Sequence, residues 1–151
     1  MACTSFGGTE QLAAEPWVYQ ELVKMRDYTS IEDVKQGAKI LFSEKAIAED
    51  FDRLMAWMGR QAADLVAPEA VMAHFGACMN FDRSRDVGDI KARTLVIGGD
   101  ADILIPTENF RRLAARIPGA KLILYPGCGH GFTVEVADAV NRDVLAFLTA
   151  P

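Results

Sequence analysis

The sequence predicts an α/β fold in which strands and helices alternate after a long helical segment. Half of the 151 residues are apolar, enough for one sizeable core. Residues 9–85 carry apolar side chains at helical spacing and contain no convincing strand, whereas residues 90–151 alternate short apolar runs with helical patterns. We therefore expect a single structural unit with an α/β core and a helical insertion.

The first eight residues read as the end of a core strand. A few strand-like residues run directly into Gly7-Gly8, which favours a turn. A strand of ordinary length, about 5–6 residues, would have to begin before Met1. We expect residues 1–8 to be the last part of such a strand.

Residues 9–89 are predicted to form a helical cap or lid of about four short helices. Ser30 and Asp33 have the spacing of a capping box, and Pro68 is suited to the first turn of a helix. Ser43 can cap a helix whose apolar face is formed by Ile47, Phe51, Leu54, Met55 and Met58. The methionines and aromatic residues are interpreted as core packing or as the lining of a lid.

Residues 90–151 are predicted to form a C-terminal βαβα core. Residues 95–99 read as a parallel strand buried on both faces, and residues 122–125 as a second one. Between them, Thr107 can cap a helix with an apolar face of Phe110, Leu113, Ala114 and Ile117. A final helix over residues 133–149 is expected to cover the sheet with Ala137, Val140, Val144, Leu145 and Leu148.

Composition argues against several classes of function. The net charge is −5 and no basic run occurs, so neither nucleic acid nor an anionic membrane is an expected partner. The start of the sequence does not resemble a signal peptide and no segment has membrane-spanning length, which favours the cytoplasm. The three cysteines have neither paired nor CxxC spacing, so we expect reduced thiols rather than disulfides or zinc ligands.

Two ionisable residues follow the two predicted strands at the same edge of the sheet. Asp102 follows the first strand and His130 the second, and ligand sites in open α/β sheets lie at the carboxyl ends of strands. Neighbouring strands are about 4.8 Å apart, so these loops can bring a carboxylate against an imidazole. Such a carboxylate fixes the ring tautomer, and the ring can then take a proton from a nucleophile. Asp102 and His130 are therefore the candidate catalytic acid and base.

Two other ionisable residues are interpreted as structural. His74 lies within a helical apolar pattern without a carboxylate partner at useful spacing. Asp100 is expected to be a solvated turn residue or a support for its loop.

The stretches Asp89–Pro106, Ile117–Ala120 and Gly127–His130 resemble the last two strands of the α/β-hydrolase superfamily. The closer likeness is to lactonase, esterase and haloperoxidase-like members with a helical cap. The resemblance implies a partial α/β-hydrolase fold, with the last three parallel strands, flanking helices and a helical cap insertion. It places Asp102 at the triad acid, in a GxxDxxxP pattern, and His130 at the triad base, in a GxGH pattern.

The sequence departs from this family by lacking the G-x-S-x-G turn that carries the nucleophile. The implied activity is hydrolysis of a carboxylic ester or lactone by a Ser-His-Asp mechanism, with no nucleophile in this chain. Loss of a nucleophile costs on the order of 10⁶ in turnover, so we expect the chain alone to be inactive. We also expect a homo-oligomer or a complementing chain to cover the exposed edge of the first strand.

Three alternatives remain open at this point. Asp100-Ala101-Asp102 resembles the DxD of haloacid-dehalogenase-type phosphatases, but Leu104 stands where that motif has Thr or Val. The glycine-rich loop at residues 127–131 lacks the GxGxxG spacing of nucleotide-binding loops. The third alternative is a non-catalytic binding or oligomerising module on a hydrolase scaffold. No cofactor or metal is implied, and the substrate-binding residues are not identified.

Overall fold

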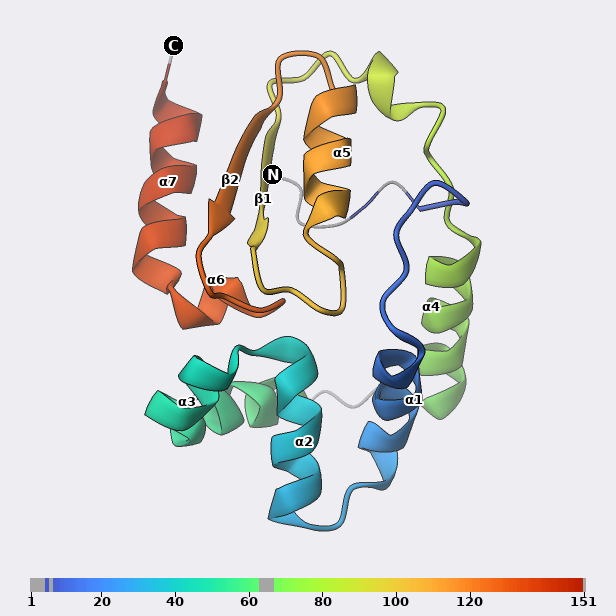
Figure 1. The fold of residues 1–151 in the computed structure, drawn as a ribbon, viewed down its shortest axis with the longest axis vertical. Coiled ribbons are helices and arrows are strands. Elements are labelled where there is room, and N and C mark those ends of the chain that lie inside the picture. Colours follow the sequence, from blue (N-terminus) through green and yellow to red (C-terminus); the bar gives the residue numbers. More distant parts are fainter. Residues whose placement is uncertain (1–4, 6, 63–66, 151) are drawn as a thin grey trace.

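The computed structural model describes residues 5, 7–62 and 67–150, and Figure 1 shows their arrangement. Two strands stand side by side with one helix on each face. The carboxyl ends of both strands point toward a group of helices formed by the first half of the chain (Figure 1). The edge of the sheet where the candidate residues were predicted therefore faces this helical segment, residues 9–89.

The sheet consists of two parallel strands, β1 (Leu95–Gly99) and β2 (Lys121–Tyr125). Leu95 pairs with Lys121 at one end and Gly99 with Tyr125 at the other. All five residues of β1 are buried, as predicted for a strand covered on both faces. The third strand expected at residues 1–8 lies largely outside the described residues; within it, Gly7 forms an isolated antiparallel bridge with Asp82.

Helix α5 (Glu108–Arg116) covers one face of the sheet and helix α7 (Ala137–Thr149) covers the other (Figure 1). The core on the α5 side contains Val96, Phe110, Leu113 and Ile117. The core on the α7 side contains Leu95, Ile97, Tyr125, Phe132 and Val140. These two clusters confirm the predicted layering of the C-terminal half.

Three local predictions in this half were wrong. Thr107 stands at the N-cap position of α5 but does not cap it; its hydroxyl donates to the carbonyl oxygens of Gly99 (3.3 Å) and Asp100 (3.0 Å). The single helix expected at residues 133–149 is divided at Val136 into α6 (Phe132–Glu135) and α7. Leu145 and Leu148, expected to face the sheet, are 60% and 67% exposed.

The helical segment contains α1 (Pro16–Lys24), the 3₁₀ helix η1 (Met25–Asp27), α2 (Ile31–Leu41), α3 (Glu44–Ala62), α4 (Pro68–Asn80) and the 3₁₀ helix η2 (Val87–Asp89). The Ser30–Asp33 capping box is present, Ser43 Oγ accepts from the Ala46 amide at 3.1 Å, and Pro68 opens α4. The predicted helix after Ser43 is kinked at Asp50, whose Oδ1 accepts from the Arg53 amide as a second, internal cap. No helix in the described part of the chain is both long and apolar enough to cross a bilayer.

A buried asparagine attaches the N-terminal part of the chain to the core. Asn109, fully buried on α5, accepts from the Leu12 amide through Oδ1 and donates to the Leu12 carbonyl through Nδ2, both at 2.8 Å. Leu104, in the loop that carries Asp102, packs against the buried cluster of Ala14, Val18 and Ile40. These contacts hold the helical segment over the carboxyl ends of the strands.

Candidate active site

Asp102 lies in the turn after β1, and its carboxylate has hydrogen-bond donors at both oxygens. Oδ1 accepts from the amides of Leu104 (2.9 Å) and Ile105 (2.8 Å), so the turn itself fixes the side chain. Oδ2 lies 2.9 Å from His130 Nδ1. The side chain is fully buried, and the backbone donors offset the cost of burying its charge.

His130 occupies the loop between β2 and α6 and keeps a third of its side chain exposed. Because an ionised carboxylate can only accept, the pairing with Asp102 requires a proton on Nδ1. The opposite edge of the ring, which carries Nε2, then has a free lone pair. The structure thus brings together the two residues that the sequence singled out, in the geometry needed to move a proton at Nε2.

Close backbone packing at the end of β1 brings the two loops together. A Cβ atom at Gly99 would overlap the carbonyl oxygens of Cys128 and Gly129, so only glycine permits this approach. Asp100 reinforces it: its Oδ1 accepts from the Gly127 amide at 2.6 Å. Asp100 therefore supports the histidine loop, one of the two structural roles expected for it.

The histidine loop also packs directly on the helical segment, at the junction of α2 and α3. The Gly131 amide donates to the Leu41 carbonyl at 2.5 Å. A Cβ atom at Gly131 would overlap the ring of Phe42. The close approach of the helical segment therefore requires glycine at position 131. No local sequence pattern could have predicted this requirement.

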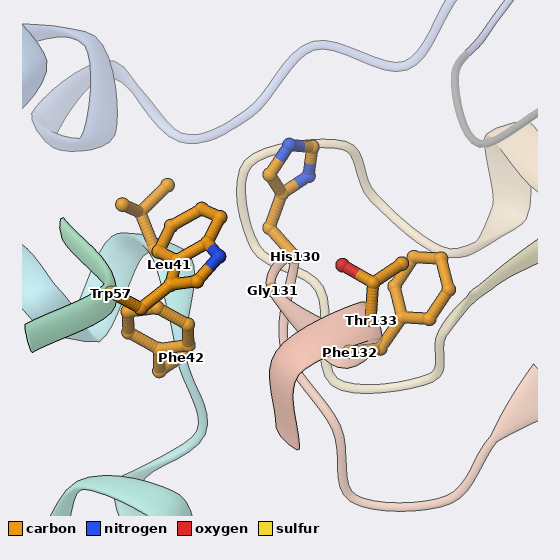
Figure 2. A pocket seen from close by; sticks show the side chains of 7 residues that line it. All are labelled: Leu41, Phe42, Trp57, His130, Gly131, Phe132 and Thr133. Carbon is orange, nitrogen blue, oxygen red and sulfur yellow. The ribbon is translucent and has the colours of Figure 1, made fainter. Parts of the chain in front are cut away.

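A small pocket of about 190 Å³ opens beside the histidine. The ring of His130 stands over it, with Leu41, Phe42 and Trp57 on one side and Phe132 and Thr133 on the other (Figure 2). The Phe42 and Trp57 rings pack edge to face, with centroids 6.0 Å apart. The sequence identified no substrate-binding residues, because this pocket forms only where the helical segment meets the core.

Glu135 is a site residue that sequence reasoning missed. Its Oε1 accepts from the amides of Gly129 (2.9 Å) and Ser43 (3.1 Å), and its Oε2 accepts from the Ser43 hydroxyl at 2.6 Å. Ser43 and Glu135 are 92 residues apart, so no local spacing signals the contact.

Cys128, two residues before His130, is a buried thiol. Burial raises its pKa to about 11, and the negative charges of Glu135 and Asp100 add to this effect. Cys78 is exposed, whereas Cys3 lies outside the described residues. The environment of Cys128 opposes thiolate formation, which does not suit a nucleophile.

The remaining predicted residues lie apart from this pair. His74, interpreted from the sequence as structural, is exposed on α4. The Asp100 and Asp102 carboxylates bind different loop amides, unlike the convergent pair of a DxD metal site. Within the described residues, no group of three His, Cys, Asp or Glu side chains could hold a metal ion.

All four serines of the chain belong to the described residues, and each forms a structural hydrogen bond. Ser5 is buried and bonds Gln11, Ser30 caps α2, and Ser43 binds Glu135. The Ser84 amide donates to Asp82 in the turn before η2. None of them stands in a strand-to-helix turn of the kind that exposes a nucleophilic hydroxyl.

The fold is that of an α/β hydrolase, and comparison with known proteins gives the family. Residues 72–151, more than half of the chain, match the family model described as TAP-like protein (Abhydrolase_4), so the chain belongs to this α/β-hydrolase family. The match covers both strands and the Asp102 and His130 loops.

Its relatives are hydrolases. The chain is 30% identical over 128 residues to a 2-hydroxy-6-oxo-6-phenylhexa-2,4-dienoate hydrolase of Burkholderia cepacia, covering 84% of this chain and 45% of the relative. Among solved structures, the esterase EaEST of Exiguobacterium antarcticum superposes with a TM-score of 0.71 at 17% identity, over 89% of this chain and 48% of the esterase. The enol-lactonase of Burkholderia xenovorans LB400 superposes with a TM-score of 0.69 at 23% identity, over 87% and 50%.

These comparisons confirm the predicted superfamily and the partial α/β-hydrolase fold. The chain spans about half the length of the proteins that it matches.

Proposed function

We propose that this chain supplies the acid and the base of a serine-type hydrolase that acts on a carboxylic ester or lactone. The observation that carries the proposal is the 2.9 Å contact between Asp102 Oδ2 and His130 Nδ1, with the opposite edge of the ring directed away from the carboxylate. Membership of a hydrolase family adds support.

In the proposed mechanism, His130 Nε2 removes the proton from a nucleophilic hydroxyl as this hydroxyl attacks the carbonyl carbon. The imidazolium then returns the proton to the departing alkoxide, which leaves an acyl-enzyme for water to hydrolyse in the same way. Asp102 holds the Nδ1–H tautomer and stabilises the imidazolium without accepting the proton itself. The nucleophile and the oxyanion donors come from outside this chain.

The pocket beside His130 favours an apolar group on the substrate. Leu41, Phe42, Trp57 and Phe132 supply most of its wall. Its volume of about 190 Å³ is below the roughly 300–1,000 Å³ of a complete ligand site, so it suits one part of a substrate. We propose that the helical segment acts as a lid and that this pocket holds the acyl chain of an ester or the apolar ring atoms of a lactone.

A non-catalytic binding or oligomerising module is the second candidate. The lack of a serine elbow favours it for the isolated chain, whereas the intact Asp102–His130 pair favours the catalytic proposal. In either case a homo-oligomer or a complementing chain is the proposed partner. Cys78 and Cys128 are free thiols, which fits the proposed location in the reducing cytoplasm.

Two assays test the catalytic proposal. The isolated chain should hydrolyse p-nitrophenyl butyrate no faster than its His130→Gln variant does, because no nucleophile reaches the base. Fused behind the N-terminal half of EaEST, it should gain esterase activity. In this fusion, His130→Gln should lower the esterase activity by about 10³-fold or more. His74→Gln, which changes an exposed histidine on α4, should leave the activity unchanged. A fusion that is equally active with Gln at position 130 would disprove the role of His130.

A further inference from the structure

The carboxylate of Glu135 joins the histidine loop to the helical segment. Its three donors come from both sides: the Gly129 amide from the loop, and the amide and hydroxyl of Ser43 from the start of α3. All three distances lie between 2.6 and 3.1 Å. Hydrogen bonds to an ionised carboxylate are about twice as strong as those between neutral groups.

Both anchored residues have defined positions next to the site. Gly129 immediately precedes His130, so fixing its amide fixes the backbone from which the imidazole projects. Ser43 Oγ also accepts from the Ala46 amide, so its single proton is free to point at Glu135. The hydroxyl thus caps α3 and binds the carboxylate at the same time.

We propose that Glu135 is a positioning residue for the base. It fixes the backbone of the histidine loop against the helical segment so that Nδ1 of His130 faces Asp102 and Nε2 lies on the opposite edge of the ring. This inference rests on the proposed function, since it assigns Glu135 a role through His130.

The loop needs such an anchor because of its composition. Residues 127–131 contain three glycines, which leave a backbone with many accessible conformations unless contacts restrict it. The bond from Gly131 to Leu41 fixes the loop after His130, and the Glu135 contacts fix it before His130. Glu135 itself lies on α6, which follows the loop directly, so the carboxylate reaches back over the histidine backbone.

The tautomer of the His130 ring distinguishes a positioning role of Glu135 from a purely structural link between the loop and the helical segment. The chain has only two histidines, so ¹⁵N-labelled histidine gives two ring systems, and His74→Gln assigns them. In mildly alkaline buffer, where a free imidazole is neutral, we expect His130 to be protonated on Nδ1 and to show a slowly exchanging, downfield Nδ1–H proton. Circular dichroism and thermal unfolding report on the fold separately.

The variants are Glu135→Ala, Glu135→Gln and, as the matched control, Glu49→Gln, which alters an exposed carboxylate on α3 that pairs with Lys45. Glu135→Ala should shift His130 toward the Nε2–H tautomer and speed exchange of its Nδ1–H and of the Gly129 amide by about tenfold or more. Glu135→Gln keeps an oxygen that accepts from both amides and should retain the wild-type ring state. Glu49→Gln should change nothing.

The outcomes separate the two proposals. If the ring state and the Gly129 exchange survive Glu135→Ala in a folded protein, the positioning role is refuted while the Asp102–His130 pair stands. If the wild-type ring itself has no Nδ1–H bonded to Asp102, the pairing fails and both proposals fall. Should Glu135→Ala not fold, Glu135→Asp decides: it keeps the charge but draws the carboxylate back from the Gly129 amide, and a wild-type ring state with wild-type exchange at Gly129 would overturn the role.

Discussion

At the scale of single residues, the site depends on how each side chain is held. Asp102 has two backbone amides on one carboxylate oxygen and the imidazole on the other. The orientation of the carboxylate does not depend on the histidine alone, because the turn amides hold Oδ1 while His130 contacts only Oδ2. The charge and the acceptor character of Oδ2 can therefore be tested without removing the turn.

Asp102→Asn should invert the ring tautomer of His130. The amide oxygen can take the place of Oδ1 at the Leu104 and Ile105 amides, which leaves the amide NH₂ facing Nδ1. Nδ1 must then accept, and the proton moves to Nε2, where it blocks general-base action. The ¹⁵N spectrum of the His130 ring should show Nε2–H in a folded protein. In the active fusion, turnover should fall by about 10⁴-fold, as the same exchange causes in serine proteases. An unchanged tautomer would contradict the pairing.

Cys128 should be slow to alkylate. Its pKa of about 11 lies two units above the reference value of 9.0, so near neutral pH the thiolate population is lower by about 100-fold. Iodoacetamide should label exposed Cys78 first, and the rate at Cys128 should rise as the pH approaches 11. Peptide mapping by mass spectrometry assigns each site, and denatured protein serves as the control for intrinsic reactivity. Equal rates at Cys78 and Cys128 in the folded protein would show that the thiol is not buried.

At the scale of elements, the ends of strands and helices decide the geometry of the site. The turn after β1 presents Asp102, and the loop after β2 presents His130. The two turns meet because Gly99 lets the Cys128–Gly129 backbone pass close by. The junction of α2 and α3 closes the other side, through Leu41 and Ser43. Each of these contacts involves a backbone group. The backbones can approach this closely only because glycine, which has no Cβ, stands at positions 99 and 131.

Two glycine substitutions should have opposite effects on stability. Gly99→Ala places a Cβ against the carbonyl oxygens of the histidine loop and should lower the free energy of unfolding by about 1–3 kcal/mol. Gly59→Ala lies on the exposed side of α3 with nothing within 4 Å of the new Cβ, and should raise it by about 0.5–1 kcal/mol. Urea unfolding followed by circular dichroism measures both. A neutral Gly99→Ala would mean that the loop is free to retreat from β1.

At the scale of the whole molecule, the distribution of apolar surface is uneven. The two strands and their flanking helices bury one apolar cluster on each face of the sheet, whereas α4 and the residue after it leave large apolar side chains exposed. Met72 is 59% exposed and Met79 63%, and Phe81 is 44% exposed. Several such side chains on one helix and its end indicate a surface that another chain can cover.

We therefore expect self-association. Sedimentation velocity at micromolar concentration should show a dimer or larger species, and Met79→Lys should shift the population toward monomer because a charge on α4 opposes burial. Leu148→Lys, at an exposed position on α7, makes the same kind of change on another helix and should leave the population unchanged. A wild-type protein that sediments as a clean monomer would contradict the expectation.

Much of the architecture could be read from local patterns. The apolar run ending in Gly98-Gly99 predicted β1, the Ser30–Asp33 spacing predicted the capping box, and Pro68 predicted the start of α4. The errors arose where a local pattern fits more than one structure. The hydroxyl of Thr107 found carbonyl acceptors in the preceding turn instead of capping α5, and the helical period over residues 133–149 did not reveal the break at Val136.

The sequence by itself determined the α/β class, the superfamily and the Asp102–His130 pair, because these depend on short patterns and on the rule that parallel strands end at one edge. Only the tertiary structure decided what surrounds the pair. Residues of the helical segment meet residues of the core in the pocket at Trp57, in the hydrogen bonds between Ser43 and Glu135, and in the close approach of Phe42 to Gly131. Such contacts form when two distant parts of a chain pack, and they are fixed by shape and hydrogen-bond geometry, which have no local sequence period.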